Sequence, residues 1–189
     1  MNINKRTLTL CEGAICVALA IALSYLKIKI GAQGGSLNFA MIPLIIFAVH
    51  SGGLGFGVLA GAIFGLLKFF FAEGFALNWE SMLLDYAVAY AAVGLAGIMK
   101  GKLNTWPRYL TAALIACLAR FVIHFISGVT VYADYAESIY LGVATPNAWV
   151  YSAVYNGFYM AFNTIAAVII CPLLGAALSR LPGAAKSKA

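Results

Sequence analysis

The run PRYLTAALIACLARFVIHFISGV, residues 107–129, decides the fold class. It is long enough to cross a bilayer, because ~20 apolar residues span ~30 Å of hydrocarbon. Two strongly polar side chains, Arg120 and His124, lie inside it. An ionisable group at the centre of a membrane helix costs about 2.5–3.5 kcal/mol on insertion scales, so it is rarely there without a function. The run therefore predicts a transmembrane helix that carries a polar site.

The whole composition agrees with a membrane protein. The chain is 63% hydrophobic and only 10% charged, with a mean hydropathy of +0.95, whereas soluble domains carry roughly 25% charged residues. We predict an all-α integral membrane protein: a six-helix transmembrane domain over residues 1–180 and a basic cytoplasmic tail over 181–189. Its apolar segments are expected at about 8–26, 37–50, 53–72, 79–99, 107–129 and 150–178. The second is short and contains Pro43, so we expect it to be kinked or partly re-entrant.

The distribution of charge in the loops orients the predicted bundle. With the amino terminus in the cytoplasm, most basic residues lie inside: Lys5, Arg6, Lys100, Lys102, Arg108, Arg180, Lys186 and Lys188. The outer loops then receive two lysines and four acidic residues: Lys27, Lys29, Glu73, Glu80, Asp134 and Glu137. This is a positive-inside pattern with both termini cytoplasmic. The net charge of +6 therefore reflects topology and does not indicate nucleic-acid binding.

Four polar side chains from three segments should lie at a similar depth. At ~1.5 Å per residue, Asp85 and Asn156 lie about 9 Å from the outer face, His124 about 8 Å and Arg120 about 14 Å. Lys68 lies one turn from the outer end of its segment. The inner half of the bundle has almost no such groups. The sequence therefore predicts a polar pocket that opens outward, not a pore.

Two interpretations of this pocket remain open. Arg120 and His124 are four residues apart and share a helix face, so Asp85 could simply neutralise Arg120 in an internal salt bridge. Alternatively the pocket binds a ligand. Aromatic residues map to the same level: Phe64, Tyr86, Phe125, Tyr132, Tyr151 and Tyr155. An aromatic wall beside a carboxylate suits a flat cationic heterocycle, although an interfacial aromatic belt has the same composition.

Catalysis and metal binding find no support in the sequence. There is no HExxH or GxSG pattern, and Cys11, Cys16, Cys117 and Cys171 lie in or beside apolar runs without metal-ligand spacing. We therefore predict neither an enzyme nor a cofactor or metal site. A phosphate-binding GxxxxGK[ST] motif is also missing, so a pump built on this chain needs a partner that hydrolyses ATP.

Small residues mark two close-packing surfaces. The third segment carries overlapping GxxxG patterns at Gly57, Gly61 and Gly65, a spacing that lets helix backbones approach each other. In the first segment Ala14, Ala18 and Ala22 form a small-xxx-small ridge. This ridge predicts either a docking face for a partner helix or packing inside the bundle.

Three runs together resemble a known family. They are Leu84-DYAVAYAAVGLA-Gly97, Arg120-FVIHFIS-Gly128 and Tyr151-SAVYN-Gly157. With the alanine ridge and Ile42-Pro43, they are similar to the thiamine-specific substrate-binding subunit of energy-coupling factor transporters. The resemblance covers nearly the whole chain. It implies a six-helix bundle in a bacterial cell membrane that binds thiamine at an outward-facing site, and that works with a transmembrane coupling subunit and two ATP-binding-cassette ATPases.

The resemblance also implies roles for individual residues. Asp85 and Tyr86 would face the thiazolium ring, while His124, Asn156 and Tyr151 would contact the aminopyrimidine. Gly128 would leave room for the ring, Tyr132 would cover it, and Ala14 and Ala18 would face the coupling subunit. Two positions depart from the family, since Gly34 and Asn38 stand where it often has tryptophan and glutamate. A subunit for another vitamin such as riboflavin, or an intramembrane enzyme, remains an alternative.

Overall fold

The computed structural model of the chain describes residues 4–30, 34–72 and 74–180, and it is mostly helical. The predicted tail at 181–189 lies outside the described residues. The helices are α1 (Lys5–Tyr25), α2 (Met41–Phe47), α3 (Gly53–Phe71), α4 (Trp79–Met82), α5 (Ala89–Val93), α6 (Thr105–Thr130) and α7 (Ala148–Ser179). Two antiparallel pairs of short strands, β1 (Ile28–Lys29) with β2 (Ser36–Leu37) and β3 (Ile139–Tyr140) with β4 (Val143–Ala144), lie in the loops.

Four shorter helical pieces join or extend these helices. Wide π-helical turns follow α2 and α4, at Ala48–Gly52 and Leu83–Val88. Turns of 3-10 helix follow α5 and α6, at Gly94–Met99 and Ala133–Tyr135. Because α4, the second π turn, α5 and the first 3-10 turn run on without a break, they form one helical column, Trp79–Met99.

Five helical stretches within the described residues are long and apolar enough to cross a membrane. They are Lys5–Tyr25, Met41–Phe71, Trp79–Met99, Thr105–Thr130 and Ala148–Ser179. Asparagine side chains define where three of the helical columns begin. Asn4, Asn78 and Asn147 each accept a hydrogen bond from a backbone N–H of the first turn, which satisfies a donor that has no partner within the helix.

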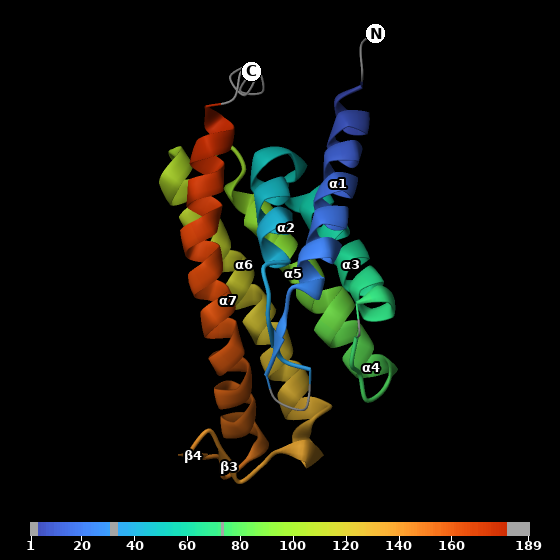
Figure 1. The fold of residues 1–189 in the computed structure, drawn as a ribbon, viewed down its shortest axis with the longest axis vertical. Helices are drawn as coiled ribbons and strands as arrows, with labels where there is room; N and C mark the ends of the chain where they lie inside the picture. The colour runs from blue at the N-terminus through green and yellow to red at the C-terminus, as the bar shows by residue number, and fades with distance from the viewer. Residues whose placement is uncertain (1–3, 31–33, 73, 181–189) are drawn as a thin grey trace.

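The second and third predicted segments lie together within the stretch Met41–Phe71, but the chain does not run straight through it. Gly53 adopts φ +67°, a conformation that favours glycine, and the chain reverses there at the end of the bundle where α1 starts and α7 ends (Figure 1). The α-helical part of α2 has only seven residues. It occupies the upper half of the bundle in Figure 1, and an extended segment continues below it.

The glycines of α3 pack directly on the neighbouring column. A Cβ at Gly61 would overlap the carbonyl oxygen of Tyr90, and one at Gly65 would overlap that of Tyr86. Gly94 presents its backbone to Gly57 in the same way. The GxxxG pattern therefore brings two backbones together, as predicted. We call this contact the glycine seam.

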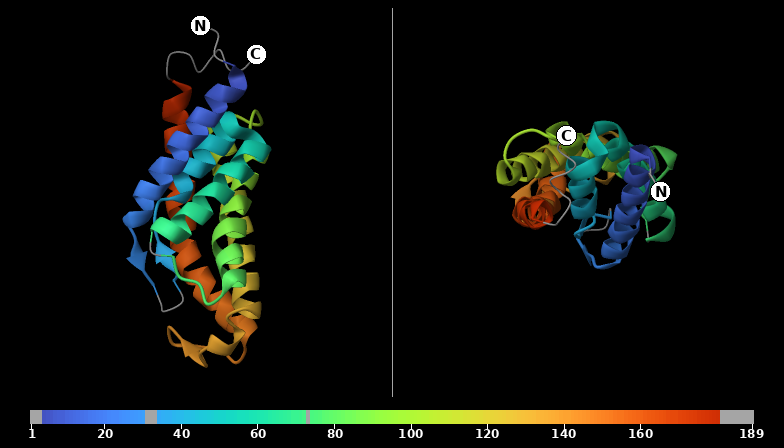
Figure 2. Two further views of the ribbon diagram at one scale, coloured as in Figure 1. Left: turned by 90° about the vertical axis from the view of Figure 1, so that its right-hand side faces the viewer. Right: turned by 90° about the horizontal axis from the view of Figure 1, so that it is seen from above.

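The two ends of the bundle differ in the elements that they hold. The start of α1 and the end of α7 lie at one end, and the two strand pairs lie toward the other (Figures 1 and 2). Viewed along the axis, α1 and α7 lie on opposite sides (Figure 2). At the end with the strands, the hydroxyl of Tyr25 donates to Phe71 O and the ammonium of Lys27 to Ala72 O. These bonds tie the end of α1 to the end of α3.

Candidate ligand-binding site

A cavity lies among α3, the column Trp79–Met99, α6 and α7, and the segment before β2 closes one side. Its space is about 620 Å³ when the opening to solvent is included. Eight of the predicted site residues line it: Asp85, Tyr86, Arg120, His124, Gly128, Tyr132, Tyr151 and Asn156. The structure thus brings together side chains from segments far apart in the sequence, and Asn38 is the predicted binding residue that it leaves outside the lining.

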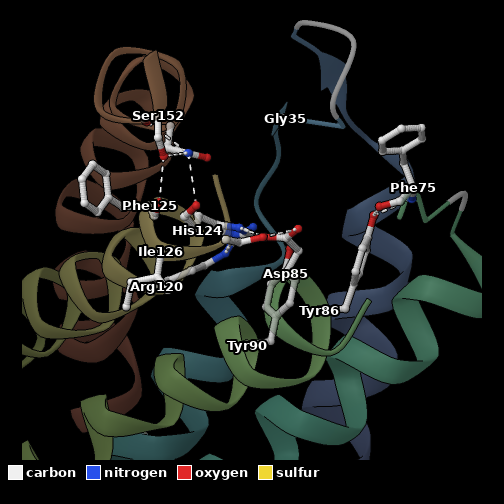
Figure 3. Close-up of polar contacts among 12 residues, drawn as sticks. Gly35, Phe75, Asp85, Tyr86, Tyr90, Arg120, His124, Phe125, Ile126 and Ser152 are labelled. Atoms are coloured by element: carbon white, nitrogen blue, oxygen red, sulfur yellow. Dashed lines mark hydrogen bonds and ion pairs between the residues drawn. The ribbon is translucent and has the colours of Figure 1, made fainter. Parts of the chain in front are cut away.

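Asp85 lies at the centre of the polar contacts (Figure 3). It belongs to the π-helical turn Leu83–Val88, a type of turn that occurs frequently at functional sites. One carboxylate oxygen contacts His124 Nδ1 at 2.9 Å, and the other accepts a hydrogen bond from Ser127 Oγ at 3.0 Å. The carboxylate is therefore held by α6 through both oxygens.

The bond from Arg120 fixes the tautomer of His124. Arg120 Nε donates to His124 Nε2 at 3.1 Å, and a guanidinium always carries its protons. His124 Nε2 is therefore the acceptor, so the ring is neutral and its proton on Nδ1 points to Asp85. Within the described part of the chain, Asp85 has no Lys or Arg partner, and its contact with His124 is a hydrogen bond from a neutral ring. The direct Asp85–Arg120 salt bridge considered from the sequence is not formed, because His124 lies between the two groups.

The contact of Ser127 with Asp85 also bears on catalysis. A serine nucleophile needs its hydroxyl on a general base such as histidine. Ser127 Oγ instead donates to the carboxylate of Asp85, and the described residues contain no group of three or more metal-ligating side chains. The geometry therefore provides a binding site without a serine–histidine pair.

Tyr86 and Tyr132 present aromatic rings beside Asp85, but their hydroxyls differ. Tyr86 Oη accepts from Phe75 N at 2.6 Å and donates to Phe75 O at 3.1 Å, which anchors the ring (Figure 3). Tyr132 Oη is buried and has no hydrogen-bond partner among the described residues. Burial raises the pKa of Tyr132 above its ordinary value, and the negative charge of Asp85 adds to this shift. A neutral phenol with a free O–H thus faces this side of the cavity.

Tyrosines recur every fourth residue along α7. The rings of Tyr151 and Tyr155 stack at 5.8 Å and 19°, and Tyr155 meets Tyr159 edge-on at 5.8 Å. Tyr140 of β3 packs against both Tyr151 and Tyr155. Sequence reasoning identified the first two of the α7 tyrosines and missed Tyr159. The same four-residue spacing would have found it.

Asn156 and Gly128 join α6 to α7. Asn156 Nδ2 donates to His124 O at 3.2 Å and to Ser152 O at 3.1 Å, while its Oδ1 accepts from Tyr159 Oη at 2.9 Å. A Cβ at Gly128 would overlap Ser152 Oγ and lie 3.1 Å from Asn156 Nδ2. Gly128 thus allows the helices to approach in addition to lining the cavity.

Asn38 organises the segment that closes the cavity, although it does not line it. Its Nδ2 donates to Ser36 Oγ at 3.0 Å, and its backbone N donates to Asn163 Oδ1 at 3.1 Å. Ser36 and Gly34 do line the cavity. Asn38 is therefore one contact removed from the site. The sequence showed only that Asn38 is a polar residue near Pro43. This does not indicate whether its side chain lines the cavity or supports the residues that do.

The floor of the cavity is built on Tyr90, which sequence reasoning did not single out. Lys68 Nζ donates to Tyr90 Oη at 2.6 Å, and the Arg120 guanidinium lies over the Tyr90 ring at 4.2 Å. Tyr90 stands in an alanine-rich run, so its residue type alone did not mark it. The other lining residues not placed in the site from the sequence are Gly35, Ser36, Phe75, Ser127, Ser152 and Tyr159.

A second hollow, which we call the groove, lies between α1 and α3. It is lined by Thr9, Leu10, Gly13, Ala14, Val17, Ala18, Ile21, Phe47, Phe56, Leu59, Ala60, Ile63 and Leu67. Apart from Thr9, these residues are apolar or glycine. Ala14 and Ala18 are exposed, as is Ala22. The alanine ridge therefore faces away from the bundle and is not used to pack it.

Fold and site together define a class: a membrane-embedded helical protein with an enclosed, polar and aromatic ligand cavity. Comparison with known proteins identifies the family. Residues 10–182 match the thiamine transporter protein family (Thia_YuaJ), and the chain belongs to this family of transporters, which are not enzymes.

Individual relatives agree in length and fold. Thiamine transporter ThiT of Bacillus subtilis is 32% identical, over 92% of this chain and 93% of its own. Thiamine transporter ThiT of Lacticaseibacillus paracasei is 29% identical, over 92% and 90% respectively. The solved structure of ThiT from Listeria monocytogenes superposes with a TM-score of 0.81 at 25% identity, covering 92% of this chain and 96% of that one.

Proposed function

We propose that this chain binds thiamine in the cavity and takes it up as the substrate-specific subunit of an energy-coupling factor transporter. The observation that carries the proposal is the placement of Asp85. Its carboxylate lines an aromatic cavity and has no cationic side chain of Lys or Arg in ion-pair contact among the described residues. A half-buried carboxylate that lines such a cavity attracts a cationic ligand, and thiamine carries a positively charged thiazolium.

The two rings of thiamine find complementary partners. Tyr86 and Tyr132 offer aromatic faces beside Asp85, which suits the thiazolium through stacking and cation–π attraction. The unpaired Oη of Tyr132 is available for a hydrogen bond with the ligand. On the other wall, Asn156 Oδ1 accepts one hydrogen bond and retains a second lone pair. It is a suitable acceptor for the amino group of the pyrimidine, which would lie against Tyr151.

The proposed topology has six spans, with α2 as a short sixth member, and both termini in the cytoplasm. Its support is the position of the basic residues. Lys5 and Arg6 begin α1 at the end of the bundle where α7 ends. Lys100 donates to Ser51 O, so the loop after the column Trp79–Met99 lies at this same end. The cavity would then open to the outside of a bacterial cell membrane.

The groove is the proposed docking face for a transmembrane coupling subunit, which two ATP-binding-cassette ATPases would drive. Small exposed residues let a partner helix approach closely, and Ala14 and Ala18 present such a surface. The chain itself has no ATP-binding motif. Uptake against a gradient therefore requires partners.

Fluorescence titration of the purified chain tests the proposal. Trp149 packs against Phe125 with ring centroids 5.8 Å apart, one residue beyond His124, so a ligand in the cavity should alter its emission. We expect saturable binding of thiamine at sub-micromolar concentration without ATP or partners, and none of riboflavin. Saturable binding of riboflavin with no response to thiamine would contradict the proposal. Identification by mass spectrometry of the vitamin that co-purifies provides an independent check.

A further inference from the structure

The cavity contains more positive than negative charge. Three side chains of the acidic and basic types line it: Lys68, Asp85 and Arg120. Asp85 makes its two contacts to His124 and Ser127, and His124 is neutral because it accepts from Arg120. Lys68 is 6% exposed and Arg120 is 4% exposed. Within the described ranges, neither of these cations forms an ion pair with a carboxylate.

This imbalance is unexpected in a site for a cation. Buried charges are normally paired, because each loses its hydration. Here both cations lie over the ring of Tyr90, with the Lys68 ammonium 4.9 Å and the Arg120 guanidinium 4.2 Å from the ring centre. A cation–π contact offsets only part of the lost hydration. Bringing a further positive charge into the cavity would increase the repulsion.

The polar groups at the cavity floor also offer more hydrogen-bond donors than acceptors. Tyr90 Oη accepts from Lys68, so its own O–H remains to donate, and no described residue accepts it. Arg120 donates through Nε to His124 and through Nη1 to Met41 Sδ, a weak acceptor. Lys68 and Arg120 thus keep further N–H donors. Around Tyr90 the donors outnumber the acceptors, and such a floor favours an anion and disfavours a cation.

We propose that a small inorganic anion of the chloride class binds at the cavity floor, between Lys68, the O–H of Tyr90 and Arg120. One negative charge there brings the three lining charges to zero. The anion also screens Lys68 and Arg120 from a cationic ligand. It therefore binds together with thiamine, and each strengthens the binding of the other by the same factor. This coupling rests on the proposed function, whereas the anion site itself does not.

Replacement of chloride at constant ionic strength tests the coupling. Thiamine is titrated by tryptophan fluorescence in sodium chloride and in sodium gluconate, whose anion is too bulky for the floor. We expect thiamine to bind at least tenfold more tightly in chloride, with an effect that saturates as chloride rises. Equal affinities in the two salts would overturn the coupling.

Three variants locate the effect. Lys68→Met removes one cation of the floor, and Tyr90→Phe removes only its hydroxyl. Lys100→Met is the matched control, because Lys100 is exposed at the opposite end of the bundle. The chloride effect should disappear in Lys68→Met, weaken in Tyr90→Phe and persist in Lys100→Met. Full chloride dependence in both floor variants would place the anion elsewhere. If Lys68→Met does not fold, Tyr90→Phe alone decides between these outcomes.

A crystallographic experiment with bromide tests the anion site independently of which ligand the cavity binds. Crystals of the ligand-free protein in sodium bromide should show an anomalous peak between Lys68 and Arg120. A floor without bromide would overturn the anion site, even if thiamine binds. A bromide peak in a protein that fails to bind thiamine in either salt would uphold the anion site and refute the proposed function.

Discussion

The cavity and the groove differ in what lines them, although α3 contributes to both. Lys68 of α3 reaches the cavity, where carboxylate, imidazole, guanidinium and phenol groups contact one another. Leu59 and Ile63 of α3 line the groove, where Thr9 supplies the polar side chain. The cavity is specific because hydrogen bonds have direction, and the groove is suited to close contact because its alanines are small. In the proposed function a single helix thus separates the ligand site from the docking face, and changes on its two sides should have separable effects.

The largest expected effect is on uptake. Ala18→Leu adds a branched side chain to the ridge of α1 and should prevent close approach of the coupling subunit. We expect cells to lose thiamine uptake, while the purified variant binds thiamine with unchanged affinity. Uptake of labelled thiamine and fluorescence titration measure the two properties. The matched control is Ala161→Leu on the exposed face of α7, which should keep both. Lost binding in Ala18→Leu would mean that the two regions are coupled.

The second effect is on affinity. Asp85→Asn removes the negative charge but keeps the shape, and the amide can still meet His124 and Ser127. Breaking one half of a buried charge pair costs about 3–5 kcal/mol, so thiamine affinity should fall by roughly two to three decades or more. A neutral analogue should bind the original chain more weakly and lose much less in the variant. Asp134→Asn, at an exposed carboxylate, is the control. Equal losses for both ligands would remove Asp85 as the counter-ion of thiamine.

A third, smaller effect concerns the glycine seam between α3 and the column Trp79–Met99. Gly61→Ala places a methyl group on the carbonyl of Tyr90, and overpacking of this kind costs about 1–3 kcal/mol of stability. Thermal unfolding in detergent should show a lower midpoint. Gly55→Ala is the matched control, because a Cβ there meets nothing within 4 Å. Equal midpoints for the two variants would show that the seam is not tightly packed.

The smallest predicted effect is at Tyr132. Tyr132→Phe removes a buried hydroxyl that has no partner in the described residues. The ligand-free protein should therefore be as stable as before or more so, since an unsatisfied polar group is lost. Thiamine should bind about tenfold more weakly, which corresponds to roughly one hydrogen bond. Thermal unfolding and titration of the same sample measure both. Weaker binding together with lower stability would assign Tyr132 a structural role instead.

The level of a residue along the bundle could be predicted from the sequence because helices rise by a constant amount per residue. Asp85, His124, Arg120 and Asn156 were placed at similar levels from three segments. The structure brings all four to one cavity. The partners of each group were harder to predict, because depth does not state which direction a side chain faces. One of the two interpretations paired Arg120 with Asp85 on charge alone, whereas His124 in fact lies between them.

Features that depend on the loops were beyond the sequence patterns. The strand pairs have two residues in each strand, too few for an alternating pattern to show. Asn38 lies outside the lining because its side chain bonds within its own segment, to Ser36 and the backbone of Ala40. Tyr90 went unnoticed because its importance arises from what packs on it, Lys68 and Arg120, and neither is a neighbour in sequence.

The shortness of α2 has a consequence for the size of the ligand. Seven α-helical residues rise only about 10 Å, a third of the hydrocarbon thickness. Met41 is the first residue of α2 and contacts Arg120 at the cavity floor. The cavity therefore lies beyond the amino-terminal end of this helix. The segment before α2 reaches the cavity lining through Gly34, Gly35 and Ser36, and a helix extended backward from Met41 would replace part of this segment. One added turn of helix, about 5.4 Å, would shorten the cavity by that amount, and one turn fewer would deepen it. The residue at which α2 begins thus sets the length of the molecules that this fold can accept.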